Sequence, residues 1–182
     1  MDTRQLLLND WTQVEQKLFS LLCLRAGESL SQREIAQLLH VSPTAIANSI
    51  PKLIDAKLIT LTKTKTINFI SLNRDEKSAI ESKRVENLEN FYTCGLSEYL
   101  EAELAGSTIV LFGSYSRGED VNQSDIDIAI IGRAEKTLAL SIYESKLHRK
   151  INVNYYKTLR AINVNLRSNI CNGIVIHGSI CL

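Results

Sequence analysis

The sequence has 182 residues, 45% of them hydrophobic, and its 21 basic and 20 acidic side chains leave a formal net charge of +1. This length suits one ordinary domain or two small ones. The small net charge excludes a global attraction to nucleic acid or membrane, so any basic patch must be local. No apolar run approaches the roughly 20 residues that a membrane helix needs, and the first residues lack a signal-peptide profile. We therefore expect a cytoplasmic protein.

The four cysteines are far apart and form no C-x-x-C pair. The three histidines do not lie near them in a metal-ligand pattern, so the sequence does not predict a zinc site. We expect reduced and mostly buried thiols.

The first part of the chain, residues 1–73, predicts three helices followed by a hairpin. Apolar residues recur at helical spacing from Trp11. A second helix begins at Ser31, where Ser31 and Glu34 have capping-box spacing. A third, over residues 42–56, begins at Ser42-Pro43, an N-cap followed by proline. Residues 58–62 and 67–72 then predict two strands, joined by the turn Lys63-Thr64-Lys65-Thr66.

This order, and the stretch SQREIAQLLHVSPTAIANSIPKLIDAKLI in particular, resembles the winged helix-turn-helix family. The resemblance implies an α+β DNA-binding domain with residues 42–56 as recognition helix and 58–72 as wing. It implies DNA contacts by Thr44, Asn48, Lys52, Lys63 and Lys65. A winged helix used for dimerisation or protein contact is the alternative, because residues 42–57 contain no arginine, the best guanine reader, and Pro51 should kink the helix.

Residues 74–105 are highly charged and predict a helical connector: a long helix, a break near Cys94-Gly95 and a shorter helix. Val85, Leu88 and Tyr92 fall on one face of the long helix, an apolar stripe that suits docking or dimer packing. The charges are expected to cover a solvated face.

The third part, residues 106–182, holds the most informative stretch, TIVLFGSYSRGEDVNQSDIDIAII. A β-branched strand over residues 108–112 ends at Gly113-Ser114, where glycine permits close backbone approach to phosphate and serine adds a hydroxyl. Asp125 and Asp127 begin the next strand, on one face because residues i and i+2 point the same way. Two carboxylates there predict a hard oxygen site suited to Mg²⁺.

The arrangement G-S-x10-D-x-D, with Arg117-Gly118 between, resembles the minimal members of the polymerase-beta-like nucleotidyltransferases. The resemblance implies an α/β fold with a small mixed sheet. It implies that Gly113 and Ser114 hold the triphosphate of a nucleoside triphosphate (NTP), with ATP the expected one, and that Asp125 and Asp127 are catalytic and bind Mg²⁺. Arg117 either neutralises phosphate charge or pairs with Glu119 or Asp120 at the surface.

Active members of that superfamily carry a third carboxylate on a later strand. Here a helical stretch over residues 134–150 leads to a predicted strand over 151–156, where Asn152, or failing that Asn154, takes the acid's position. An asparagine side chain cannot ionise, which weakens a two-metal mechanism. The tail predicts a helix over about 158–171 and a strand over 174–178, with His177 in a structural role.

Three functions follow. The first is an enzyme that transfers a nucleoside monophosphate from the NTP to a hydroxyl on a protein, nucleic acid or small molecule, coupled to a DNA-binding domain. The second is a nucleotide-sensing transcriptional regulator with little or no turnover, favoured by Asn152. The third is a scaffold with a relic site. The order of domains also resembles prokaryotic winged-helix nucleotidyltransferases labelled transcriptional regulators. The resemblance to the minimal nucleotidyltransferases implies a helical partner protein. We expect a homodimer, because two-fold DNA sites favour dimers.

Overall fold

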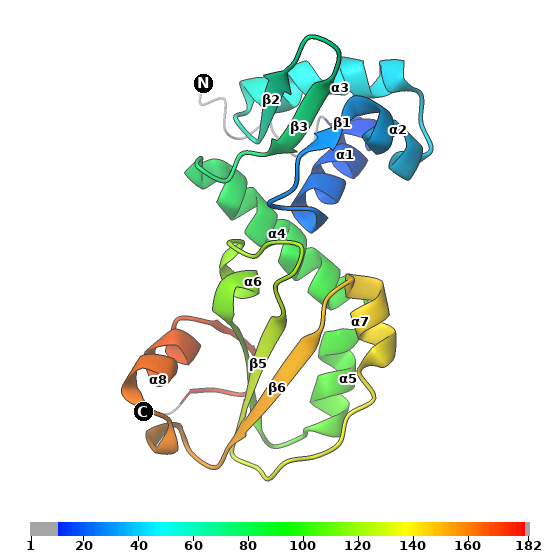
Figure 1. Cartoon of the computed structure of the whole chain (residues 1–182). Coiled ribbons are helices and arrows are strands. Elements are labelled where there is room, and N and C mark those ends of the chain that lie inside the picture. Colours follow the sequence, from blue (N-terminus) through cyan, green and yellow to red (C-terminus); the bar gives the residue numbers. More distant parts are fainter. Residues whose placement is uncertain (1–10, 181–182) are drawn as a thin grey trace. The chain divides into compact units, whose positions relative to one another are not determined.

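The computed structural model describes residues 11–180, which divide into two compact units with the boundary between Ser82 and Lys83. The first unit contains helix α1 (Gln13–Leu24), strand β1 (Leu30–Ser31), helices α2 (Gln32–Leu39) and α3 (Pro43–Asp55), and strands β2 (Ile59–Lys63) and β3 (Asn68–Leu72). The strands form an antiparallel sheet in the order β1-β3-β2 (Figure 1). The predicted helices and hairpin are confirmed; the two-residue strand β1 was not predicted.

The helix starts of the first unit are the ones that the sequence signals. Ser31 and Glu34 form a complete capping box, in which Ser31 N donates to Glu34 Oε2 at 2.7 Å and Glu34 N donates to Ser31 Oγ at 3.2 Å. Ser42 Oγ accepts from Ala45 N, with Pro43 in the first turn. Helix α3 continues through Pro51 to Asp55. A buried core that includes Leu18, Ile46 and Ile70 joins the helices to the sheet.

Helix α4 (Lys77–Thr93) begins in the first unit and continues into the second, followed by α5 (Leu96–Glu103). The predicted break is confirmed, because Gly95 at the start of α5 adopts a left-handed conformation with φ of 86°. The pattern of buried and exposed side chains on the long helix differs from the one expected. Val85 and Tyr92 are 54% and 43% exposed, whereas Lys83 is fully buried. The expectation that the charges of this segment cover a solvated face is therefore wrong at Lys83.

The second unit is built on a four-stranded mixed sheet in the order β6-β5-β4-β7. Its strands are β4 (Thr108–Phe112), β5 (Ile126–Ile131), β6 (Ile151–Tyr156) and β7 (Ile174–His177), with the short helix α6 (Gly113–Arg117) directly after β4. Strand β4 is antiparallel to β5 and β7, and β5 is parallel to β6. The sheet lies between α4 and α5 on one side and α8 (Val164–Cys171) on the other (Figure 1).

Two helical predictions in the second unit are wrong. Of residues 134–150, only α7 (Ser141–Leu147) is helical. The preceding segment has no regular secondary structure and is held in place by tertiary hydrogen bonds: Ala139 N donates to Tyr99 Oη at 2.7 Å, and Tyr155 Oη donates to Lys136 O at 2.8 Å. The tail helix is split into the 3-10 turn η2 (Leu159–Ala161) and α8, because Asn163 caps a new helix by accepting from Leu166 N.

The described cysteines are less buried than expected, since Cys23 is buried, Cys94 is half-buried and Cys171 is exposed at the end of α8. Cys181 lies outside the described residues. None of the helices in residues 11–180 is both long and apolar enough to cross a membrane.

Candidate nucleotide and metal site

The Gly113-Ser114 turn and the two aspartates meet at one end of the sheet in the second unit. Phe112, the last residue of β4, pairs with Asp127 on β5. Gly113 is buried, with φ of 79°, and a Cβ atom built at this position would lie 2.5 Å from Asp127 Oδ2. The left-handed backbone and this close approach both require glycine. The turn therefore packs directly on one of the predicted metal ligands.

Asp125 and Asp127 are both half-buried, and Asn152 is exposed beside them. Asn152 is the partner of Asp127 in the parallel β5–β6 register. Its Nδ2 donates to Asp125 Oδ2 at 2.9 Å. The two carboxylates, one just before β5 and one on it, thus form a single cluster with the amide on β6. Asn154 lies two residues further along β6, opposite Ala129.

Electrostatics in this cluster favour the arrival of a cation. Burial raises the pKa of Asp127 above its usual value, a hydrogen bond from Asn152 opposes the shift, and the charge of Asp125 adds to it. Two carboxylates that repel each other in a partly buried site are stabilised by a bound divalent ion. Mg²⁺ commonly uses one or two carboxylates and completes its shell with water and substrate phosphates. The donor set fits such an ion, although residues 11–180 contain no group of three or more His, Cys, Asp or Glu side chains placed to hold one.

Two further predicted residues occupy α6. Ser114 is half-buried in its first turn. Arg117 is held by two side chains: its Nε donates to Glu119 Oε2 at 2.7 Å, and its Nη1 donates to Asn169 Oδ1 of α8 at 3.1 Å. The pairing with Glu119 is one of the alternatives that the sequence left open. His177 on β7 lies elsewhere, with Nδ1 3.6 Å from Glu101 Oε2 of α5.

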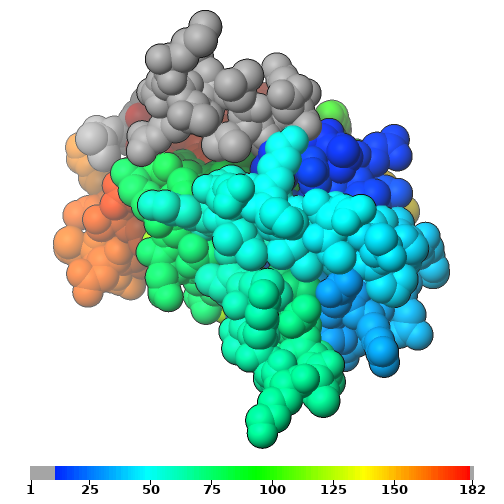
Figure 2. Space-filling model, turned by 90° about the horizontal axis from the view of Figure 1, so that it is seen from above, coloured from blue at the N-terminus to red at the C-terminus, as the bar shows by residue number. Residues whose placement is uncertain are grey.

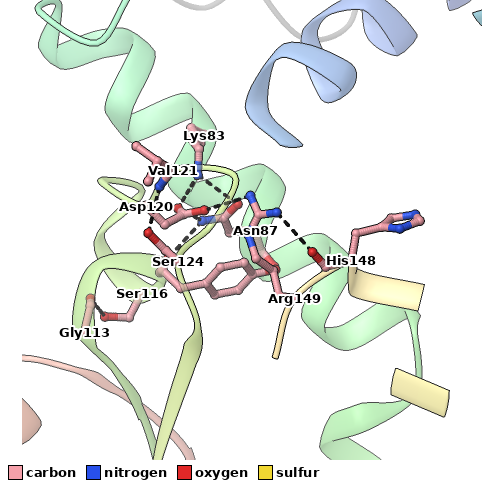
Figure 3. A network of polar contacts seen from close by, with 10 residues as sticks. Lys83, Asn87, Gly113, Ser116, Asp120, Val121, Ser124, His148 and Arg149 are labelled. Carbon is pink, nitrogen blue, oxygen red and sulfur yellow. Dashed lines mark hydrogen bonds and ion pairs between the residues drawn. The ribbon is translucent and has the colours of Figure 1, made fainter. Parts of the chain in front are cut away.

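A buried polar network next to this site was missed by sequence reasoning (Figure 3). Lys83, Asn87, Asp120 and Arg149 are all at least nine-tenths buried. Lys83 Nζ pairs with Asp120 Oδ1, and Arg149 Nη2 lies 3.5 Å from Asp120 Oδ2. The one available signal is the spacing of four residues that places Lys83 and Asn87 on the same helical face as Phe91. Lysine and asparagine do not ordinarily mark a buried face.

The residues proposed for DNA contact belong to the first unit. Thr44, Asn48, Lys63 and Lys65 are exposed. Lys52 is half-buried, and its Nζ lies 3.4 Å from Glu15 Oε2 of α1. Figure 2 shows α3 in cyan on one face of this unit, with the tip of the β2–β3 hairpin, in teal-green, protruding from it.

Residues 95–181 match the family model described as polymerase beta, nucleotidyltransferase. The matched region includes the whole G-S-x10-D-x-D stretch, the mixed sheet and Asn152. The C-terminal part of the chain therefore carries a polymerase beta nucleotidyltransferase domain, which confirms the resemblance for this part. Comparison with curated proteins and with solved structures gave no match.

Proposed function

We propose that residues 106–182 form a Mg²⁺-dependent nucleotidyltransferase that transfers a nucleoside monophosphate from an NTP, with ATP expected, to a hydroxyl acceptor. The packing of Gly113 against Asp127 carries this proposal, because it brings a phosphate-binding turn and a metal-binding carboxylate within direct contact. Asp125 and Asp127 hold the ion, and Gly113 and Ser114 hold the phosphates. Arg117 neutralises phosphate charge, and its guanidinium exchanges Glu119 for the phosphate as its partner.

In this reaction the acceptor oxygen forms a bond to the α-phosphorus, the bond from the α-phosphorus to the bridging oxygen breaks, and pyrophosphate leaves. The ion supplies charge stabilisation for the in-line displacement. The chain supplies orientation, since Gly113 fixes the turn against the β5 strand. Asn152 cannot take the acceptor's proton, because an amide is not a base at neutral pH. The proton therefore passes to an aspartate or to solvent, and we expect slow turnover.

A nucleotide-sensing regulator with little or no turnover is the second candidate, and Asn152 favours it. Its amide donates to Asp125 where active members of the superfamily carry a third carboxylate. A site with two carboxylates retains the ligands for a metal–nucleotide complex. Such a complex changes DNA affinity only by binding one conformation of the protein better than another.

We further propose that residues 1–73 form a winged helix-turn-helix that binds DNA and that residues 74–105 connect it to the transferase. The element order, with a third helix followed by an antiparallel hairpin, supports this. The exposure of Thr44, Asn48, Lys63 and Lys65 on α3 and the hairpin supports it as well. Homodimerisation and a helical partner protein are proposals that the exposed Val85 and Tyr92 of α4 support.

The test of transferase activity is incubation with Mg²⁺ and each of the four α-labelled NTPs, with and without cell extract. The variant Asp125→Asn/Asp127→Asn is the control, because amides keep the shape of the site and remove its charge. Label on a macromolecule or small molecule that is absent with the variant supports transfer. Bound but untransferred nucleotide favours the sensor. Equal labelling by the variant would reject both roles of the aspartates.

A further inference from the structure

The buried network on α4 connects that helix to α6, to the loop before β5 and, through Asp120, to Arg149 just before β6 (Figure 3). Asn87 holds α6: its Nδ2 donates to Tyr115 O at 2.9 Å, and Tyr115 Oη donates to Asn87 O at 3.0 Å. Burial, and then the charge of Asp120, raise the pKa of Tyr115, so its hydroxyl stays protonated as a donor. Tyr115 lies two residues after Gly113 in the same short helix.

Asp120 holds the loop between α6 and β5. Its Oδ1 accepts from Lys83 Nζ and, at 2.7 Å, from Asn87 Nδ2. This loop is also closed on itself, since Val121 N donates to Ser124 Oγ at 3.0 Å. The next residue in the chain is Asp125. A shift of Asp120 therefore propagates through a short, hydrogen-bonded loop to the first carboxylate of the cluster.

Arg149 holds the beginning of β6 by the same carboxylate, with Nη2 3.5 Å from Asp120 Oδ2. The carbonyl of the neighbouring residue Lys150 accepts from Ile126 N at 2.8 Å, which joins the starts of β5 and β6 directly. Asn152 follows two residues later, opposite Asp127. One buried carboxylate thus links the strand that carries Asn152 to the loop that precedes Asp125.

We propose that Lys83 is a positioning residue for the metal-binding carboxylates, acting through Asp120 and Arg149. This inference rests on the proposed metal site. A buried cluster of charges is an inefficient way to stabilise a fold, because desolvation offsets much of the attraction. It fixes geometry, however, since Asp120 keeps both cations only with the loop and the strand in one arrangement. Partners that orient metal ligands in this way typically contribute about 10–100-fold to metal affinity.

The number of buried charges around Asp120 decides which substitution removes one contact and still allows the protein to fold. Lys83 and Arg149 are two buried cations that share Asp120. Lys83→Met keeps the length of the side chain and leaves a one-to-one pair of Asp120 with Arg149, so this variant is expected to fold. Asp120→Asn leaves two buried cations without their carboxylate and is expected to be strongly destabilised. Phe91→Leu is the matched control, because Phe91 is fully buried on the same face of α4, two turns after Lys83.

The experiment is a Mn²⁺ titration of the full-length wild type, Lys83→Met, Phe91→Leu and Asp125→Asn/Asp127→Asn, well below each variant's unfolding temperature. Wild type binds and the aspartate variant does not; Lys83→Met binds about tenfold more weakly, and Phe91→Leu binds like wild type. Amide exchange without metal is expected to accelerate over residues 119–127 in Lys83→Met and not in Phe91→Leu. If Lys83→Met binds Mn²⁺ with wild-type affinity, or if Phe91→Leu loses as much Mn²⁺ affinity as Lys83→Met, the inference is overturned. The proposed metal site is unaffected by either result. Wild type that binds no Mn²⁺, or an aspartate variant that still binds, overturns the proposed site and the inference with it.

Discussion

Asn152 stands directly opposite Asp127 in the parallel register of β5 and β6. Its side-chain amide is engaged by Asp125, to which it donates at 2.9 Å. The position where active members of the superfamily carry a third acid thus holds a neutral group that pairs with one of the two proposed metal ligands. The hydrogen bond from Asn152 stabilises the two adjacent carboxylates when no metal is bound. A neutral amide does not, however, supply the negative charge that a second metal ion needs.

The substitution Asn152→Asp tests this relationship. A third carboxylate adds a charged oxygen ligand, and we expect Mn²⁺ to bind about tenfold more tightly, because affinity for hard cations rises with ligand charge. Without metal the variant is expected to be less stable than wild type, since the hydrogen bond to Asp125 is replaced by repulsion. Asn154→Asp is the control, because Asn154 lies opposite Ala129. Weaker Mn²⁺ binding by Asn152→Asp than by wild type would contradict the placement.

Gly113 offers a test of steric fit between the turn and the metal ligand. Gly113→Ala combines a strained φ with a clash against Asp127 Oδ2, and we expect Mn²⁺ affinity to fall at least about tenfold. Gly106→Ala is the matched control, because Gly106 also has a positive φ, of 83°, and no atom lies within 4 Å of its added Cβ. Both variants should be destabilised by about 1–2 kcal/mol through left-handed backbone strain. Equal Mn²⁺ affinity in the two would show that the contact with Asp127 is unimportant.

Asp127→Asn separates function from stability. The folded-state pKa of Asp127 is raised by burial and by Asp125, so the stability that its protonated form provides is present at low pH. It is lost as pH rises from the unfolded-state value, about 3.9, through the folded-state value. At neutral pH without metal, we expect Asp127→Asn to melt at a higher temperature than wild type. Added Mg²⁺ should raise the melting temperature of wild type only. A lower melting temperature for the variant in metal-free buffer is the contrary result.

The structure separates what the sequence predicts from what it does not. Capping residues such as Ser31 and Ser42, and the strand before Gly113, are local signals and were predicted well. The segment before α7 was misassigned because Tyr99 and Tyr155, distant in sequence, hold it in a non-helical conformation. Lys83 and Asp120 were missed because two charged residues 37 positions apart read as solvated until the fold pairs them. The register that places Asn152 beside Asp127 is likewise a tertiary property.

The hairpin lysines provide a separate test of DNA binding. Lys63→Gln/Lys65→Gln should weaken binding to the protein's own promoter across sequences. In a plot of the logarithm of the binding constant against the logarithm of the salt concentration, the slope should become shallower by about one for each phosphate that the lysines no longer neutralise. The control is Lys17→Gln, an exposed lysine on α1 outside α3 and the hairpin. Binding curves at several salt concentrations measure both quantities. A salt slope unchanged in the double variant would place the DNA surface elsewhere or exclude one.

The proposed function requires that Asp125 and Asp127 hold a divalent ion beside the Gly113-Ser114 turn. The most direct measurement is a crystal structure with Mn²⁺ and a non-hydrolysable NTP, in which the anomalous signal locates the metal. We predict a peak bound to oxygens of both carboxylates at about 2.1 Å, the distance typical of small hard cations, with the triphosphate against residues 113–114. Nucleotide bound elsewhere, with no metal peak between the two aspartates, would exclude this site as the nucleotide and metal site.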